Sequence, residues 1–257
     1  MRRLHRPSLG RKTWVWLSLR TRQVLAAEDP KTRAVELWRT LARHRYRARV
    51  HQALQSLSSG VGRCMYCEDS AAHEVEHFRP KARYPERAFC WENLLLVCGK
   101  CNRSKLAQFP LDARGEPLLI DPTAEDPALH LDTSPRQGRL VARNGSPKGQ
   151  KTIDVLKLNR WELVRGRQNA WLGLEELLRC YAEHQAAGRH ERAERCKREI
   201  CERPFSALLH FMLRILELPD PGRYLEDPSC VGTLRSLAPE IRAWLEAAAG
   251  SPEIRRR

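Results

Sequence analysis

Two cysteine pairs constrain this chain more than any other feature of its sequence. The segment CMYCEDSAAHEVEHFRPKARYPERAFCWENLLLVCGKCNRSK, residues 64–105, begins with one C-x-x-C motif and ends with another. Each motif can place two thiolates about 2.3 Å from one tetrahedral zinc ion. The 30 residues between the motifs exceed the roughly 15 to 20 of a compact zinc ribbon, so a folded element must lie between them. The expected ligands of one structural zinc ion are Cys64, Cys67, Cys98 and Cys101.

The cysteine total and the N-terminus indicate the compartment. The chain has 257 residues and nine cysteines, and its first residues contain no apolar run long enough for a secretory signal or a membrane span. A reducing cytoplasm is therefore expected, without membrane association. In that compartment, C-x-x-C pairs indicate metal or redox chemistry. A thioredoxin-like redox motif fits less well, because no βαβ pattern surrounds either pair.

The positive charge is concentrated at one end of the chain. The net charge is +15, and residues 1–63 contain 15 Lys and Arg against 3 Asp and Glu. Residues 64–120 contain 8 against 8, and residues 121–257 contain 23 against 20. This distribution predicts a polyanionic partner that contacts the N-terminal region.

Residues 31–57 are predicted to form one basic helix. Its apolar stripe would contain Val35, Trp38, Leu41, Val50, Leu54 and Leu57. The opposite face is rich in arginine, which suits a phosphate backbone, although a solvated basic face is the alternative. The residues of this face expected to bind nucleic acid are Arg43, Arg45 and Arg47.

Hydrophobic periodicity and Pro or Gly positions divide the chain into four segments. We expect a basic arm and helix over 1–60, a zinc-stapled module over 61–112, an irregular connector with a small hairpin over 113–150, and a helical domain over 151–257. The hairpin strands are expected at 118–120 and 140–142. Two of the C-terminal helices are expected to begin at Pro204 and Pro239. The fold class is therefore α+β, mostly helical.

The segment between the cysteine pairs predicts a strand, a loop, a second strand and a helix. HEVEHF alternates as a strand does, with Val75 and His77 on one face and Glu74, Glu76 and Phe78 on the other. The apolar run LLLV, residues 94–97, is the second strand, and the helix begins around the second cysteine pair. One zinc ion would fix both ends of this unit.

These motifs together resemble the HNH nucleases, which have a ββα-metal site. The matching pattern is C-x-x-C, an acidic residue followed by His, then Asn before an apolar strand, and finally C-x-x-C-N-x-x-K. The resemblance extends to EHFRPK, to W-x-N-L-L-L, and to the later KTIDVLKLNR. Over most of residues 64–167 the chain is similar to the HNH subunit of Septu-type and related retron anti-phage systems.

The resemblance implies specific roles for four residues. His77 would be the general base, and Asn93 would orient the loop that holds it. Glu76 and Asn102 would bind a divalent cation; Glu and Asn stand where many HNH nucleases have Asp and a further His. Phosphodiester hydrolysis requires such a base and a Lewis acid, and oxygen ligands suit Mg²⁺ or Mn²⁺.

Cations beside the site would bind the neighbouring phosphates. They follow the His and Asn of the motif directly, although solvated charges are the alternative. These residues are Arg79, Lys81, Arg103 and Lys105.

The sequence therefore predicts a metal-dependent HNH endonuclease that cleaves nucleic acid, with DNA favoured over RNA. The Septu-type resemblance implies an antiviral defence role in which a partner ATPase switches the nuclease on, with the C-terminal helices as the docking surface. The alternative is a non-catalytic, zinc-dependent nucleic-acid-binding protein. Salt-dependent binding without metal-dependent cleavage would identify that alternative.

Overall fold

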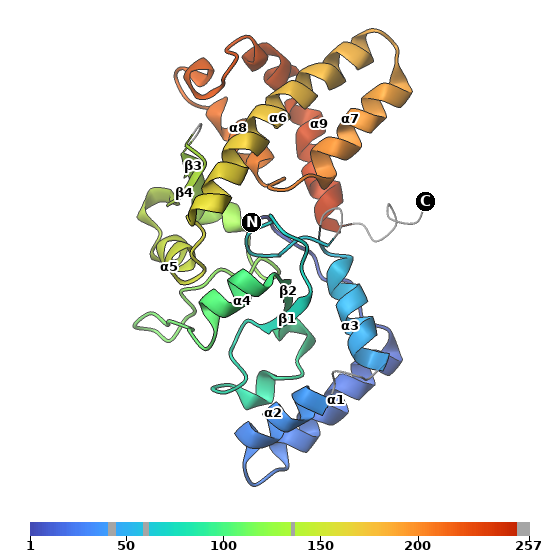
Figure 1. Ribbon diagram of the computed structural model, residues 1–257, viewed down its shortest axis with the longest axis vertical. Helices are drawn as coiled ribbons and strands as arrows, with labels where there is room; N and C mark the ends of the chain where they lie inside the picture. The colour runs from blue at the N-terminus through green and yellow to red at the C-terminus, as the bar shows by residue number, and fades with distance from the viewer. Residues whose placement is uncertain (41–44, 59–61, 135–136, 251–257) are drawn as a thin grey trace.

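The computed structural model describes residues 1–40, 45–58, 62–134 and 137–250, without the side chains of 247–250. The N-terminal helices lie at one end of an elongated molecule and the C-terminal helices at the other, with a small strand-and-helix module between them (Figure 1). None of the helices in these ranges is long and apolar enough to cross a bilayer.

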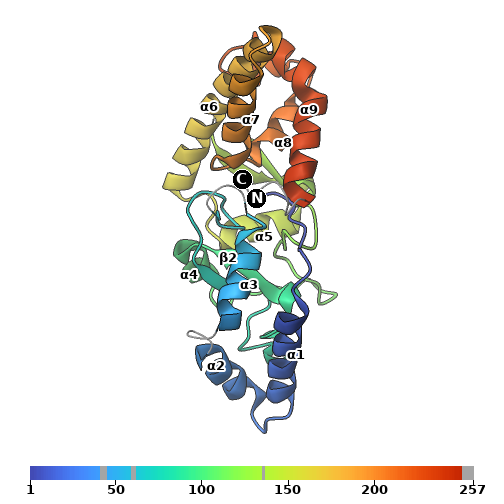
Figure 2. The same cartoon turned by 90° about the vertical axis from the view of Figure 1, so that its right-hand side faces the viewer.

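Among the described residues, the N-terminal region contains three helices. They are α1 (Arg11–Leu25), α2 (Pro30–Thr40) and α3 (Arg45–Gln55). The expected single helix over 31–57 is therefore wrong, because α2 and α3 run in different directions (Figure 2), and residues 41–44, which include Arg43, lie outside the described ranges. Asp29 precedes α2, and its carboxylate accepts hydrogen bonds from the backbone N–H groups of residues 31 and 32, which caps the helix.

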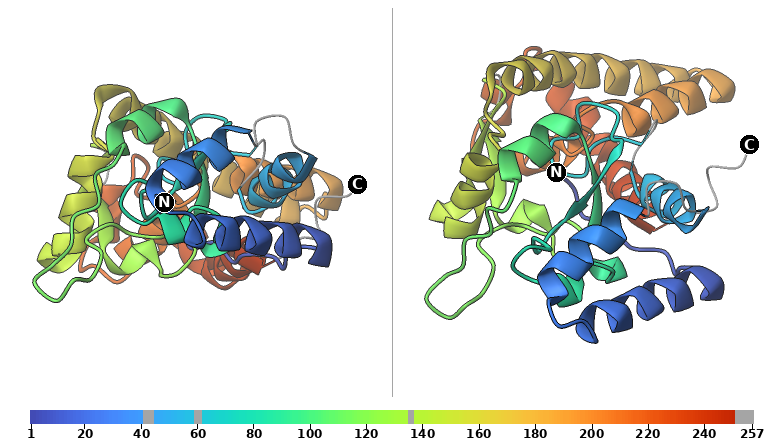
Figure 3. Two further views of the ribbon diagram at one scale, coloured as in Figure 1. Left: turned by 90° about the horizontal axis from the view of Figure 1, so that it is seen from below. Right: turned by 60° about the horizontal axis from the view of Figure 1, so that its bottom comes forward.

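Helices α1 and α2 pack against each other at the end of the molecule opposite α6 and α7 (Figure 3). The residues before α1 are also packed rather than a loose arm. Met1 and Leu4 are buried, and the Met1 amino group donates to the Glu68 carboxylate at 2.9 Å. The basic N-terminal segment therefore joins the core beside the zinc module.

The module has the predicted strand, loop, strand and helix. Strand β1 (Glu74–His77) pairs antiparallel with β2 (Leu94–Val97), and α4 (Gly99–Lys105) follows directly. The register places Glu74 opposite Val97 and His77 opposite Leu94. All four residues of β2 are buried, which explains its uninterrupted apolar sequence.

The connector contains one hairpin, and one of its two predicted strands is wrong. β3 (Leu131–Ser134) pairs with β4 (Arg139–Ala142), which confirms the strand near 140–142. Residues 118–120 form no strand. Leu119 and Ile120 are buried, and the Ile120 N–H donates to the Thr152 hydroxyl. This apolar run is therefore buried in a loop rather than in a strand.

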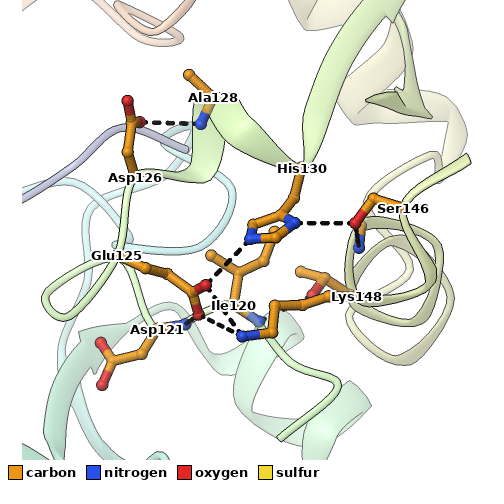
Figure 4. Close-up of polar contacts among 10 residues, drawn as sticks. Ile120, Asp121, Glu125, Asp126, Ala128, His130, Ser146 and Lys148 are labelled. Atoms are coloured by element: carbon orange, nitrogen blue, oxygen red, sulfur yellow. Dashed lines mark hydrogen bonds and ion pairs between the residues drawn. The ribbon is translucent and has the colours of Figure 1, made fainter. Parts of the chain in front are cut away.

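A polar network fixes the connector to the helix that follows (Figure 4). Ser146 precedes that helix and accepts a hydrogen bond from the Gly149 N–H. The His130 ring lies 2.9 Å from the Ser146 hydroxyl and 3.1 Å from the Glu125 carboxylate, and Lys148 pairs with the same carboxylate. These contacts fix both ends of the hairpin segment to the start of that helix.

The C-terminal region is helical as predicted, with different helix limits. Its helices are α5 (Pro147–Val155), α6 (Trp161–Ala186), α7 (His190–Glu202), α8 (Leu208–Ile215) and α9 (Cys230–Gly250). Pro204 lies in the turn before α8, and Pro239 lies inside α9, so neither begins a helix. Short 3₁₀ turns occur at Pro85–Arg87, Trp91–Asn93, Pro127–Leu129, Arg143–Gly145 and Pro221–Tyr224.

Candidate functional site

The four predicted zinc ligands form one cluster. The sulfur atoms of Cys64, Cys67, Cys98 and Cys101 lie within 4.8 Å of one another, and all four residues are buried. The first pair lies in the turn before β1, and the second pair lies at the start of α4. A thiolate set with this spacing fits a tetrahedral zinc ion that joins the hairpin to its helix.

Arg160 lies beside this cluster and was not singled out from the sequence. Its two terminal guanidinium nitrogens are each 3.8 Å from the Cys101 sulfur. Four thiolates around one Zn²⁺ carry a net negative charge, which this cation offsets. Arg160 directly precedes α6, so the contact also joins the C-terminal region to the module.

His77 is the last residue of β1, and its side chain is enclosed. It is 4% exposed, and its Nε2 lies 3.0 Å from the Ala88 carbonyl oxygen. A carbonyl only accepts hydrogen bonds, so Nε2 carries the proton and Nδ1 is left as the basic nitrogen. The Trp38 ring of α2 makes an edge contact with the imidazole, with 4.3 Å between ring centroids.

Burial changes the basicity of this imidazole. It lowers the pKa of His77 from 6.5 to about 3, and the positive charge of Lys81 acts in the same direction. The ring is therefore neutral at physiological pH, but it is a weak base while it stays enclosed. A general base works best with a pKa near the operating pH.

The same pKa shift predicts acid sensitivity of the fold. The folded-state pKa of His77 lies below its unfolded value, so the unfolded chain binds more protons between those values and stability falls as pH drops below about 6.5. From about pH 6.5 to about pH 5 we expect a loss of roughly 2 kcal/mol from His77. Urea unfolding of the wild type and His77→Gln at both pH values would measure it.

Acid would also weaken zinc binding in both proteins. The test therefore compares the acid-induced loss of unfolding free energy in the wild type with the loss in His77→Gln. His210, whose pKa burial also lowers, is present in both. Equal acid sensitivity of the wild type and His77→Gln would contradict the assignment to His77.

Asn93 joins the two ends of the loop between the strands. Its side-chain oxygen accepts a hydrogen bond from the Arg79 N–H at 2.7 Å. Its side-chain nitrogen donates to the carbonyls of Arg79 and Arg87 at 3.0 Å each. Arg79 lies just beyond His77, and Arg87 precedes the carbonyl that binds the imidazole. Asn93 therefore ties Arg79 to Arg87 across the loop, and its orienting role stays a prediction.

The two predicted cation ligands make separate contacts. Glu76 is buried and pairs with Lys105, whose ammonium lies 2.6 Å from its carboxylate and 3.0 Å from the His77 carbonyl. Asn102 instead donates to Glu74 at 2.5 Å. The oxygen atoms of this group suit a hard divalent cation. The Lys105 ammonium pairs with Oε1 of the Glu76 carboxylate, so a divalent cation at Glu76 would bind beside this ammonium or displace it.

The direction of each pKa shift shows that burial is the dominant cause in this ion pair. Burial raises the pKa of Glu76 above its ordinary value, although Lys105 opposes that change. Burial likewise lowers the pKa of Lys105, against the attraction of Glu76. Both charges are therefore held against a desolvation cost, and each depends on the other.

Lys105→Met is expected to lower the free energy of unfolding by about 3 to 5 kcal/mol, because it leaves Glu76 buried without a counter-ion. The matched control is Lys100→Met on the same helix. Lys100 pairs with Glu162 at 2.8 Å, but its side chain is 62% exposed, so about 0 to 1 kcal/mol is expected. Chemical denaturation would measure both losses, and equal values would contradict the prediction.

The residues predicted to contact nucleic acid differ in their exposure to solvent. Lys105 is fully buried, so the prediction that it contacts phosphate is wrong for this structure. Arg103 and Arg45 are exposed, whereas Lys81 and Arg47 are half-buried. The half-buried Arg79 lies over the rings of Tyr84 and Phe109, and Arg45 lies over Tyr46.

Helix geometry could have located Lys105 from the sequence. It follows Cys101 by four residues in α4, so both lie on the helix face toward β1. The predicted strand alternation is also confirmed, since Glu74 and Glu76 face α4 and His77 faces α2. Trp38 appeared only as part of an apolar stripe, and no local signal paired it with His77.

Comparison with known proteins agrees with this geometry. Residues 64–108 match the family model of the HNH endonucleases, so this module is an HNH-family domain. The chain is also 37% identical over 136 residues to Septu protein PtuB of Bacillus mycoides (strain KBAB4), which covers 41% of this chain and 46% of that protein. The two predicted resemblances, to HNH nucleases and to a Septu-type protein, are confirmed.

Two further relatives have Septu names. Septu protein PtuB of Bacillus thuringiensis is 36% identical over 112 residues, which is 42% of this chain and 40% of that protein. Septu protein PtuA of Bacillus mycoides (strain KBAB4) is 28% identical over 149 residues, which is 47% of this chain and 20% of that protein. The chain therefore spans less than half the length of each relative that it matches.

Proposed function

We propose that this chain is a metal-dependent endonuclease that hydrolyses phosphodiester bonds, with DNA as the favoured substrate. The observation that carries the proposal is the His77 imidazole, which is fixed through Nε2 by the Ala88 carbonyl within an HNH-family domain. This hydrogen bond leaves Nδ1 to accept a proton from water. Asn93 holds the loop on which that carbonyl depends.

The remaining residues of the site would bind and stabilise charge. Glu76 and Asn102 would hold Mg²⁺ or Mn²⁺, with the ion bound beside Lys105 or in its place. The bound ion would supply Lewis-acid stabilisation of the developing charge. Arg79, Lys81 and Arg103 would contact neighbouring phosphates, and the cysteine cluster would hold zinc as a structural ion.

The N-terminal helices would add affinity that does not depend on nucleotide sequence. Helix α3 contains Arg45, Arg47 and Arg49 and no acidic residue. Lysine and arginine contacts with phosphates release counterions, so binding should weaken steeply as salt rises. Arg43, which lies outside the described residues, is proposed for the same role.

The similarity to Septu proteins PtuB and PtuA supports a place in anti-phage defence. We propose that the nuclease works in the cytoplasm together with a partner ATPase, and that the amphipathic C-terminal helices contact this partner. Such a nuclease would be silent or slow by itself and faster in the complex.

Cleavage of supercoiled plasmid by the purified protein tests this function. With Mg²⁺ or Mn²⁺ we expect nicked product, formed slowly by the protein alone and faster when the partner is added, and with EDTA we expect none. The second candidate is a zinc-dependent binding protein without catalysis, which the weak basicity of the enclosed His77 favours. Salt-dependent plasmid binding without nicking under any metal, alone or with the partner, would establish that candidate.

A further inference from the structure

The base proposed for catalysis cannot reach a substrate in this structure. A general base has to lie within hydrogen-bond distance of the water that it activates. That water must in turn lie in line with a phosphodiester, which needs open space above the imidazole. The His77 side chain is only 4% exposed, so no such space is present.

The group that covers His77 comes from outside the HNH-family domain. Trp38 of α2 lies 4.3 Å from the imidazole between ring centroids, with the planes inclined by 68°. The imidazole is also held through Nε2 by the Ala88 carbonyl, which is the contact that orients it. The orienting contact is therefore in place while the approach to the ring is closed by a tryptophan.

Neighbouring aromatic residues hold Trp38 in this position. Trp38 packs on Phe89 with 5.6 Å between centroids, and Phe89 also meets Trp16 of α1 at 6.4 Å. Trp16 in turn stacks on Tyr46 of α3 at 5.3 Å. The cover therefore depends on how all three N-terminal helices sit on the loop of the HNH-family domain.

The attachment of α2 itself is limited. Only Ala34 and Leu37 among its eleven residues are buried. Arg39, the neighbour of Trp38, is exposed, so the segment that carries the cover is also accessible to an anionic ligand. A helix with few buried side chains can move without unfolding the zinc-bound core.

We propose that Trp38 is an autoinhibitory side chain that covers His77, and that cleavage requires α2 to move away from the loop between β1 and β2. The proposal rests on the proposed nuclease function, because it names the regulation of that site. It gives a physical reason for a nuclease that is silent alone, and it places the switch in the N-terminal helices rather than in the catalytic residues.

The first test measures access to His77 without using activity. Diethylpyrocarbonate modifies accessible histidines, and peptide mass spectrometry can follow His77 against the exposed His73 as an internal reference. Trp38→Ala should raise the modification rate of His77 by about tenfold or more, since it removes the aromatic contact and the area that it buries. Trp14→Ala, on an exposed α1 tryptophan, should leave the rate unchanged.

The second measurement is plasmid nicking by the same proteins with Mn²⁺. Trp38→Ala should cut at least several-fold faster than the wild type, and Trp14→Ala should cut at the wild-type rate. Trp38→Leu keeps an apolar contact with Phe89 but is smaller, so it should give an intermediate rise in both assays. This variant keeps the test valid if Trp38→Ala does not fold.

The outcomes separate the two proposals. An unchanged rate of His77 modification in folded Trp38 variants, together with fast nicking by the wild type, would refute the proposal that Trp38 covers His77. The nuclease assignment would then stand. Faster modification without nicking in any variant, alone or with the partner ATPase, would refute the nuclease assignment and the regulatory role with it. A rise in both rates, limited to the Trp38 variants, is the result that supports autoinhibition.

Discussion

His77→Ala is expected to lower the rate of metal-dependent nicking by about 10²- to 10⁴-fold, the usual contribution of a positioned general base. The physical reason is the loss of Nδ1, the nitrogen that remains free to accept a proton when Nε2 donates to the Ala88 carbonyl. The measurement is conversion of supercoiled plasmid to nicked circles with Mg²⁺ or Mn²⁺, with wild type and EDTA samples alongside.

The controls for this experiment test whether the variant folds and whether Trp38 limits the rate of the wild type. Zinc content and a cooperative unfolding transition should survive the substitution, since the zinc ligands are elsewhere. His210→Ala removes another largely enclosed histidine and should leave nicking unchanged. If the wild type is slow, both substitutions are compared in the Trp38→Ala background. A His77→Ala protein that cuts at the parent rate would refute the assignment.

The second large effect is expected at the zinc site. Cys98→Ser should release the ion and unfold the module, because structural zinc contributes about 10 to 16 kcal/mol of apparent binding energy in isolated zinc-finger peptides, and that energy is folding energy. Cys98 lies at the N-terminus of α4, so its loss separates the helix from the hairpin. Zinc analysis and limited proteolysis across residues 64–105 would measure both consequences.

A matched control exists within the same module. Cys90 is half-buried and lies outside the cluster, so Cys90→Ser should keep the zinc content and the protease resistance of the wild type. Removal of zinc from the wild type with a chelator should reproduce the Cys98→Ser result. Retention of one zinc ion per chain by Cys98→Ser would show that the four cysteines do not hold the metal as proposed.

Local spacing was sufficient for the parts of the site that depend on nearby residues. The two C-x-x-C pairs identified four cysteines that the structure brings within 4.8 Å. Strand alternation separated His77 from Glu74 and Glu76, because successive side chains of a strand point to opposite faces. The connector was less predictable, since Leu119 and Ile120 are buried by a loop held through Thr152.

The sequence by itself thus determined the four-cysteine cluster, the order of strands and helix, and the HNH resemblance, because each depends on residues close together in the chain. Only the tertiary structure decided which partners the candidate site residues meet. Lys105 turns inward to Glu76 because helix α4 lies on that face of β1. Trp38 covers His77 because α2 packs on a loop far from it in sequence, which no local pattern encodes. Residues close together in the sequence form the site, whereas the packing of distant helices decides whether a substrate can reach it.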